Sequence, residues 1–71
     1  MSPTTTAEAI STIWRTESAR LVGALTRMTR DLDLAEDLAQ DALVAALEQW
    51  PDQGVPANPG AWLMSIAKRQ I

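Results

Sequence analysis

Residues 33–50, which read DLAEDLAQDALVAALEQW, predict one amphipathic helix on which the rest of the architecture depends. Asp33 can accept hydrogen bonds from the first free backbone amides and Glu36 can reach back, so the helix is expected to begin at Asp33. On a helical wheel its apolar residues form one broad arc, wider than a single packing contact needs. This arc consists of Leu34, Leu38, Ala39, Ala42, Leu43, Ala45, Ala46, Leu47 and Trp50. We therefore expect the helix to pack against two neighbours.

The remaining arc of this helix is polar and mostly acidic, with one valine at its centre. It consists of Asp37, Gln40, Asp41, Val44 and Glu48, and we name it the acidic face. No Lys or Arg occurs between residues 31 and 53, so none of these carboxylates has a basic partner one helical turn away. Two interpretations stay open: a solvated face with a lone exposed valine, or a surface that binds a basic protein.

The chain has 71 residues, enough for one small domain and too few for two. Its apolar content is dominated by Ala and Leu, which favours helices. Cys and His are both absent, so a disulfide framework, a zinc site and a histidine-based catalytic centre are excluded. We expect no metal, no cofactor and no enzymatic activity.

Membrane-spanning and export segments are not expected either. The longest apolar run, residues 42–47, is far too short to span a bilayer. The first residues lack the basic and then apolar pattern of a signal peptide. The sequence therefore predicts a cytoplasmic protein without a membrane partner.

The net charge of −3 is distributed unevenly along the chain. Residues 1–30 carry +2, residues 31–52 carry −7 and residues 53–71 carry +2. Such asymmetry between neighbouring segments indicates two different partner surfaces more than one uniform solvated shell.

Another helix is predicted upstream, over residues 7–30. Residues 1–6 have no apolar period and are expected to form a flexible tail, with Thr6 as a candidate N-cap. The helix has an apolar stripe formed by Ile10, Trp14, Leu21, Leu25 and Met28. Because the junction to the helix at residue 33 is short, the two helices are expected to form an antiparallel hairpin.

Charged residues of the upstream helix have two expected roles. Glu17 lies within the apolar stripe, where an unpaired carboxylate is costly. We therefore expect Glu17 to pair with Arg20, or with Lys68 or Arg69 further along the chain. Arg20 and Arg27 lie together on the far side of the helix, where solvation and contact with phosphate or another protein are both open interpretations.

A third helix is predicted after a loop at residues 51–59, which three prolines stiffen. Asn58 is expected to cap this helix, with Pro59 at its first position and Trp62 packed in the core. The chain stops at Ile71 without a helix stop signal, so this helix is expected to be cut short. The predicted fold class is all-α: a three-helix bundle over residues 7–71, built from an antiparallel hairpin and a third helix packed across it.

Two segments resemble a known family. Residues 35–47, AEDLAQDALVAAL, are followed by the proline-bearing loop and by residues 59–69, PGAWLMSIAKR. Together they resemble region 2 of bacterial RNA polymerase sigma factors of the sigma-70 family, most closely the extracytoplasmic-function type of group 4. The resemblance covers about residues 7–71, and the family's DNA-binding region 4 has no counterpart in this sequence.

The resemblance implies a transcription initiation factor that binds the polymerase core. In the family, the acidic and amide side of the second helix binds the basic clamp helices of the polymerase β′ subunit. Asp37, Gln40 and Asp41 match those positions. Val44 and Glu48 are added because they share the acidic face, and not because of the motif.

The resemblance also implies recognition of promoter DNA. The family uses the loop before its last helix, together with that helix, to bind the non-template strand of the minus-ten element and to help melt it. The corresponding DNA-binding candidates are Asp52, Gln53, Val55, Asn58, Lys68 and Arg69. Met64 and Arg69 depart from the residues common in the family, so contacts with individual bases do not transfer.

Other partners and functions stay open beside this one. An anti-sigma factor is a candidate partner, and so is a second copy of the chain, if the short third helix exposes Leu43, Leu47 and Trp50. From the residues alone, the acidic face also fits a general helical interaction module. A helix-turn-helix regulator that binds duplex DNA is disfavoured because a nine-residue loop precedes the third helix.

Overall fold

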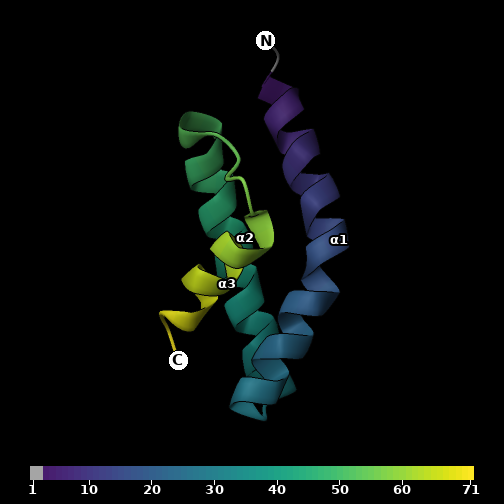
Figure 1. Cartoon of the computed structure of the whole chain (residues 1–71), viewed down its shortest axis with the longest axis vertical. Coiled ribbons are helices and arrows are strands. Elements are labelled where there is room, and N and C mark those ends of the chain that lie inside the picture. The colour runs from purple at the N-terminus through teal and green to yellow at the C-terminus, as the bar shows by residue number, and fades with distance from the viewer. Residues whose placement is uncertain (1–2) are drawn as a thin grey trace.

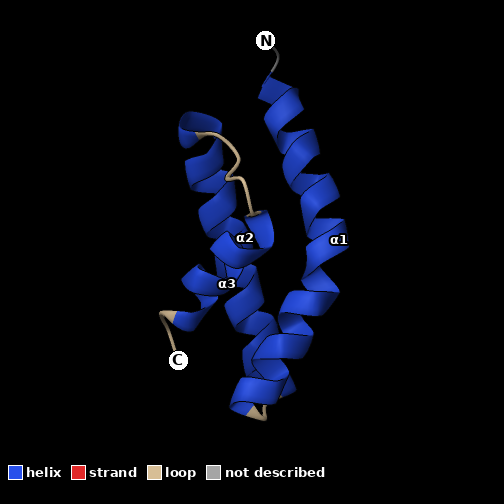
Figure 2. Ribbon diagram, viewed as in Figure 1, coloured by secondary structure: helices blue, strands red, loops and turns tan. Residues whose placement is uncertain are grey.

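The computed structural model describes residues 3–71, in which all regular structure is helical (Figure 2). Helix α1 spans Pro3–Thr29, α2 spans Leu32–Gln53 and α3 spans Pro59–Lys68. Helices α1 and α2 run antiparallel side by side, and α3 packs across them, mainly on α2 (Figure 1). The predicted all-α fold, a helical hairpin with a third helix packed across it, is confirmed.

Helix α1 begins earlier than the sequence predicts. It starts at Pro3, so residues 3–6 form its first turns instead of part of a tail, and Thr6 is not an N-cap. Proline suits the first position of a helix because its φ is already helical and its missing N–H would have no partner there. Residues 1 and 2 of the expected tail lie outside the described residues.

The junction between α1 and α2 is shorter than expected, and it sets the start of α2. Arg30 has φ 60°, and its N–H donates to the Thr26 carbonyl at 2.7 Å, which closes α1. Asp31 then caps α2, and its Oδ1 accepts from the Leu34 N–H at 3.1 Å. The prediction that Asp33 caps this helix was wrong, because the reversal at Arg30 leaves only one extended residue, Asp31, before the helix starts.

The C-terminal end of α2 also differs from the prediction. The helix continues through Pro51 to Gln53, and the loop is residues 54–58 instead of 51–59. Proline's fixed φ is compatible with a helix, and here its missing N–H removes one hydrogen bond in the last turns. Gly54 has φ 88°, and its N–H donates to the Trp50 carbonyl at 2.8 Å, which terminates the helix.

The start of α3 agrees with the sequence analysis. Asn58 is the N-cap, its Oδ1 accepts from the Ala61 N–H at 3.1 Å, and Pro59 occupies the first position. The helix ends at Lys68, and Arg69 and Gln70 continue in a turn. Within residues 3–71, no helix combines the length and apolar character needed to cross a bilayer.

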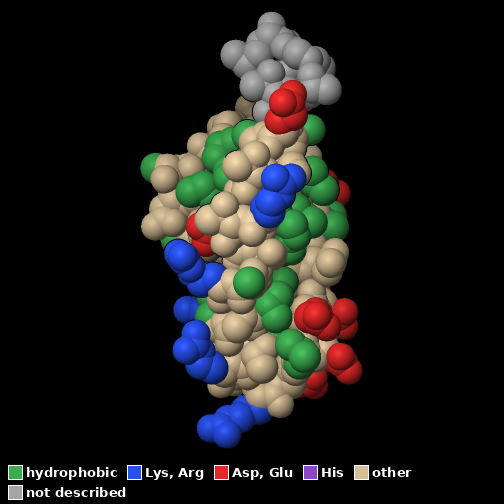
Figure 3. Space-filling view, turned by 90° about the vertical axis from the view of Figure 1, so that its right-hand side faces the viewer, with side chains coloured by type: hydrophobic (Ala, Val, Ile, Leu, Met, Phe, Trp, Pro, Cys, Tyr) green, Lys and Arg blue, Asp and Glu red, His purple; other side chains and the backbone are tan. Residues whose placement is uncertain are grey.

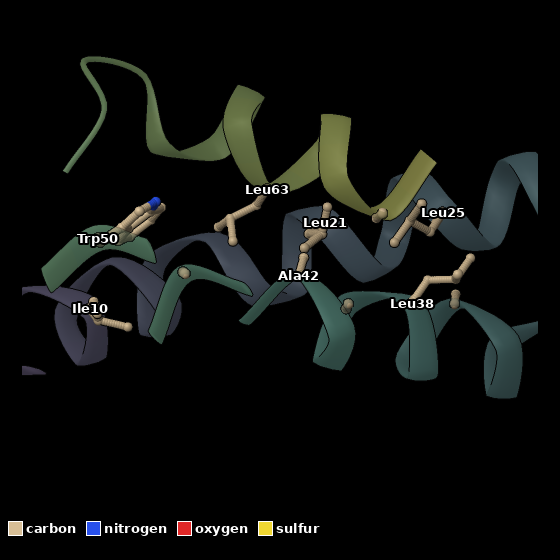
Figure 4. Packing of buried hydrophobic residues seen from close by; sticks show 11 residues of the cluster. Ile10, Leu21, Leu25, Leu38, Ala42, Trp50 and Leu63 are labelled. Carbon is tan, nitrogen blue, oxygen red and sulfur yellow. The ribbon is translucent and has the colours of Figure 1, made fainter. Parts of the chain in front are cut away.

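A single apolar core joins the three helices. Its buried members are Ile10, Leu21, Leu25, Ala35, Leu38, Ala39, Ala42, Ala46, Trp50, Leu63 and Ala67. Leu63 points from α3 towards the space between Trp50 and Leu21 (Figure 4). The rings of Trp50 and Trp62 are 5.2 Å apart in an edge-to-face arrangement, so Trp62 packs in the core region as expected. Helix α2 does pack against two neighbours.

The buried arc of α2 is narrower than the predicted one. Leu34 and Leu47 were assigned to it but are 42% and 50% exposed, whereas Ala35, which was not assigned to it, is fully buried. Alanines at the centre of the arc let α1 and α3 approach the α2 backbone closely, so larger side chains at the edges stay outside. Trp50 is only 2% exposed, so of the three residues expected to form a dimer surface Leu47 alone is strongly exposed.

Glu17 has a neighbour that the sequence analysis did not name. Its carboxylate lies against Gly60 in the first turn of α3, so close that a Cβ atom on Gly60 would be 2.6 Å from Glu17 Oε1. Lys68 and Arg69 are at the other end of that helix. The positive end of a helix dipole stabilises a nearby carboxylate. The start of α3 therefore gives the Glu17 carboxylate a favourable electrostatic environment where α3 crosses α1.

Candidate functional site

The acidic face is a continuous exposed surface of α2. Asp37, Gln40, Asp41, Val44 and Glu48 are all exposed, and Val44 is 50% exposed. They recur at spacings of three and four residues, which places them on one side of the helix over a length of about 16 Å. The opposite side of α2 is the buried alanine arc. The packed core therefore holds these five side chains on a rigid support.

Leu47 belongs to the surface beside the acidic face, a position that the sequence analysis missed. It is 50% exposed and follows Val44 by three residues, so the two side chains are neighbours on the helix. Together they form a short apolar strip that runs from the centre of the acidic face to its margin. Its position on the helical wheel, at the margin of the broad apolar arc and next to Gln40 of the acidic face, was the feature that could have identified Leu47.

Charge is segregated on the folded molecule as it is along the chain. In the lower half of Figure 3, acidic side chains gather at the right edge and basic side chains at the left, whereas the upper half carries both kinds. Residues 31–52 contribute seven of the nine acids and no base, so α2 itself supplies no cation to the acidic face. An apolar centre bordered by carboxylates is complementary to a partner with basic and apolar side chains.

The six DNA-binding candidates fall into two groups. Asp52 and Gln53 lie in the last turn of α2, and Val55 and Asn58 lie in the following loop. All four are exposed, although Asn58 Oδ1 is already engaged as the cap of α3. This group is therefore located at one end of α3.

The second group, Lys68 and Arg69, is exposed at the other end of α3. Helix α3 has ten residues, so Asn58 and Lys68 lie about 15 Å apart along its axis. The structure does not bring the two groups together, so they cannot contact the same nucleotide. Met64 is partly buried against the core and does not belong to either group.

Residues 3–71 contain no group of three His, Cys, Asp or Glu side chains arranged to hold a metal ion. An open hollow lined by Thr26, Arg27 and Arg30 lies at the tip of the hairpin. Two of its three lining residues are arginines, so the hollow presents positive charge.

Comparison with known proteins identifies the family. A family model described as Sigma-70 region 2 matches residues 13–71. An uncharacterized protein of Rhizobium meliloti (strain 1021) is 47% identical over 47 residues, which cover 66% of this chain and 11% of the relative. The chain thus spans a small part of that relative's length. No solved structure matches the chain. From the extent of the family match, the chain belongs to the Sigma-70 region 2 family, whose members bind RNA polymerase and recognise promoters.

Proposed function

We propose that the chain is the region 2 domain of an extracytoplasmic-function sigma factor and that its acidic face binds the clamp helices of the polymerase β′ subunit. The observation that carries this proposal is the exposed set of five residues on one rigid side of α2, with no base between residues 31 and 53. A basic coiled coil would supply the missing charges, and Val44 with Leu47 would provide the apolar contact at the centre. The domain works in the cytoplasm as a binding module and not as an enzyme.

We propose further that α3 and the loop before it bind the non-template strand of the minus-ten element. A protein without ATP can melt DNA only by binding the separated strand more tightly than the duplex. Val55 and Asn58 would face an extruded base at the loop, and Lys68 and Arg69 would neutralise phosphates one helix length away. The Asn58 cap and the Glu17 contact with the first turn of α3 support this assignment, because they hold the loop and the helix in a fixed relation.

The alternative function, a helix-turn-helix regulator that binds duplex DNA, has less support. The loop of residues 54–58 is shorter than predicted, which weakens the earlier argument from loop length. The exposed side of α3, however, presents Ala61, Ser65 and Lys68. A recognition helix needs several exposed Arg, Asn or Gln side chains to reach base edges, and α3 lacks them.

The first test is calorimetry with a peptide hairpin of the β′ clamp helices at low and moderate salt. The Asp37→Arg, Asp41→Arg double variant should abolish a salt-sensitive interaction. The matched control is Glu8→Arg, Glu36→Arg, which changes the net charge equally at two exposed residues outside the acidic face. Retained folding of both variants is verified by circular dichroism.

The outcomes separate the proposal from a general interaction module. Binding that the control retains and the double variant loses assigns the acidic face. No binding by the unmodified chain, or equal weakening by both variants, would contradict the proposal and leave a helical domain whose acidic surface serves another basic protein.

A further inference from the structure

A second charged surface lies on α1 and is not used by the proposed contacts with β′ and the minus-ten strand. Arg20, Arg27 and Arg30 are all exposed, and residues 18–30 contain no acidic side chain. Arg20 and Arg27 are seven residues apart, which places them on the same side of the helix and about 10 Å apart along its axis. Arg30 extends the series at the tip of the hairpin. We name these three residues the basic face.

The tip of the hairpin shapes one end of the basic face. Arg27 and Arg30 line the open hollow together with Thr26. The Thr26 hydroxyl donates to the Val22 carbonyl at 2.7 Å, so the guanidinium groups are the free donors there. The Arg30 backbone is held at φ 60° by its own N–H bond to Thr26, which fixes the position from which this side chain extends.

Gly23 supplies an independent observation at the middle of the same surface. Glycine in a helix interior destabilises the helix relative to alanine, so it usually has a packing reason. Here a Cβ atom on Gly23 would meet nothing within 4 Å. The residue lies three positions after Arg20 and four before Arg27, so it leaves the helix backbone open between two guanidinium groups. A partner that approaches the α1 backbone closely would account for it.

We propose that the basic face binds the phosphate backbone of duplex DNA, independently of sequence. This inference rests on the proposed function, which brings promoter DNA to the domain. Guanidinium groups match phosphate oxygens in a two-donor geometry, and duplex DNA presents about one charge per 1.7 Å of its axis. The open backbone at Gly23 leaves room for a strand to lie against the helix between the two arginines.

Two features of α1 favour a duplex over the other anionic partners. Single-stranded nucleic acid is bound by cations together with aromatic stacking surfaces, and residues 18–30 contain no aromatic side chain. Protein interfaces have an apolar centre, whereas the surface between Arg20 and Arg27 consists of Gly23 and small or polar neighbours. The exposed Met28 lies about 100° further round the helix from Arg27 and is outside the basic face.

The test is an NMR titration of the chain with a 16-base-pair duplex of unrelated sequence at low salt, followed at the arginine Nε–H signals. Signals of Arg20, Arg27 and Arg30 should shift together. Arg15 is an internal control, because it is exposed on a different side of the same helix. In a salt series, Arg27→Gln should weaken duplex binding about eightfold at 0.1 M salt and lower the salt dependence by about one ion, as expected for one lost phosphate contact. Arg15→Gln should change neither.

Three results would overturn the inference. The first is no shift at the basic face with millimolar duplex, and the second is an equal shift at Arg15. The third is a shift of Arg20 and Arg27 with the β′ clamp peptide instead of the duplex, which would assign this surface to the polymerase. The proposed function is judged separately, by the loss of clamp binding in Asp37→Arg, Asp41→Arg and by the response of Lys68 and Arg69 to a single strand.

Discussion

Trp50 connects the helices through one side chain. It is 2% exposed, its ring packs edge-to-face on Trp62, and its buried Nε1–H has no acceptor among the described residues. Trp50→Ala should lower the free energy of unfolding by about 3–5 kcal/mol, a large part of what so small a domain has. Trp62→Ala should cost clearly less because Trp62 is only partly buried. Thermal unfolding followed by circular dichroism measures both, and equal losses would contradict the assigned role of Trp50.

Asn58 combines a structural role with a proposed role in DNA binding, and two substitutions separate them. Asn58→Ala removes the oxygen that accepts from the Ala61 N–H, so it should cost about 1 kcal/mol of stability. Asn58→Asp keeps a capping oxygen and should be nearly neutral in thermal unfolding, yet its charge should weaken binding of a minus-ten single strand measured by fluorescence anisotropy. Unchanged strand binding by Asn58→Asp would remove this residue from the proposed DNA surface.

The capping residues also show how far the structural role of a single residue can be predicted from the sequence. Asn58 followed by Pro59 is a local signature, and the structure agrees with it. For α2 the sequence analysis named Asp33, whereas the cap is Asp31, and its position depends on the left-handed turn at Arg30, which follows from how the hairpin closes. Glu17 could be predicted to need a partner. That the partner is the first turn of α3 depends on the crossing of two helices and could not be read from spacing.

Helix α1 contains a glycine, Gly23, whose effect on the free energy of unfolding can be measured. Because a Cβ atom on Gly23 would contact nothing within 4 Å, Gly23→Ala should raise the free energy of unfolding by about 0.5–1 kcal/mol. Gly54→Ala is the contrasting control, since Gly54 has φ 88° and ψ 159°, and an alanine there should destabilise by about 1–3 kcal/mol. Thermal unfolding of both variants checks the prediction. A destabilised Gly23→Ala variant would show that this glycine has an internal structural role.

At the level of helices, type and pairing could be predicted but boundaries and burial could not. Apolar periodicity and the short junction were enough to predict three helices and an antiparallel hairpin. The end of α2 was misplaced because Pro51 was treated as a terminator, although Gly54 ends the helix. The exposure of Leu47 and the burial of Ala35 depend on where α1 and α3 cross α2. The five members of the acidic face lie together as predicted, whereas the DNA candidates occupy two separate ends of α3.

Because charge is unevenly distributed over the whole molecule, binding of one proposed partner should change the affinity for the other. Acidic and basic side chains lie at opposite edges of the lower half of the domain in Figure 3, and the net charge of −3 repels DNA as a whole. A basic clamp peptide on the acidic face would offset this repulsion without occupying the basic face. Duplex affinity at low salt should therefore increase a few-fold when the peptide is saturating.

The salt dependence of this coupling is the decisive part of the measurement. At 0.15 M salt the screening length is about 8 Å. This is shorter than the separation expected for surfaces on opposite sides of two packed helices. The increase in duplex affinity caused by the peptide should therefore disappear. Fluorescence anisotropy of a labelled duplex, with and without the peptide, measures it across a salt series. The Asp37→Arg, Asp41→Arg variant is the control, because it cannot bind the peptide and its duplex affinity should not respond. A decrease in duplex affinity on adding the peptide would mean that both ligands compete for one surface, and two separate faces would then be the wrong description of this domain.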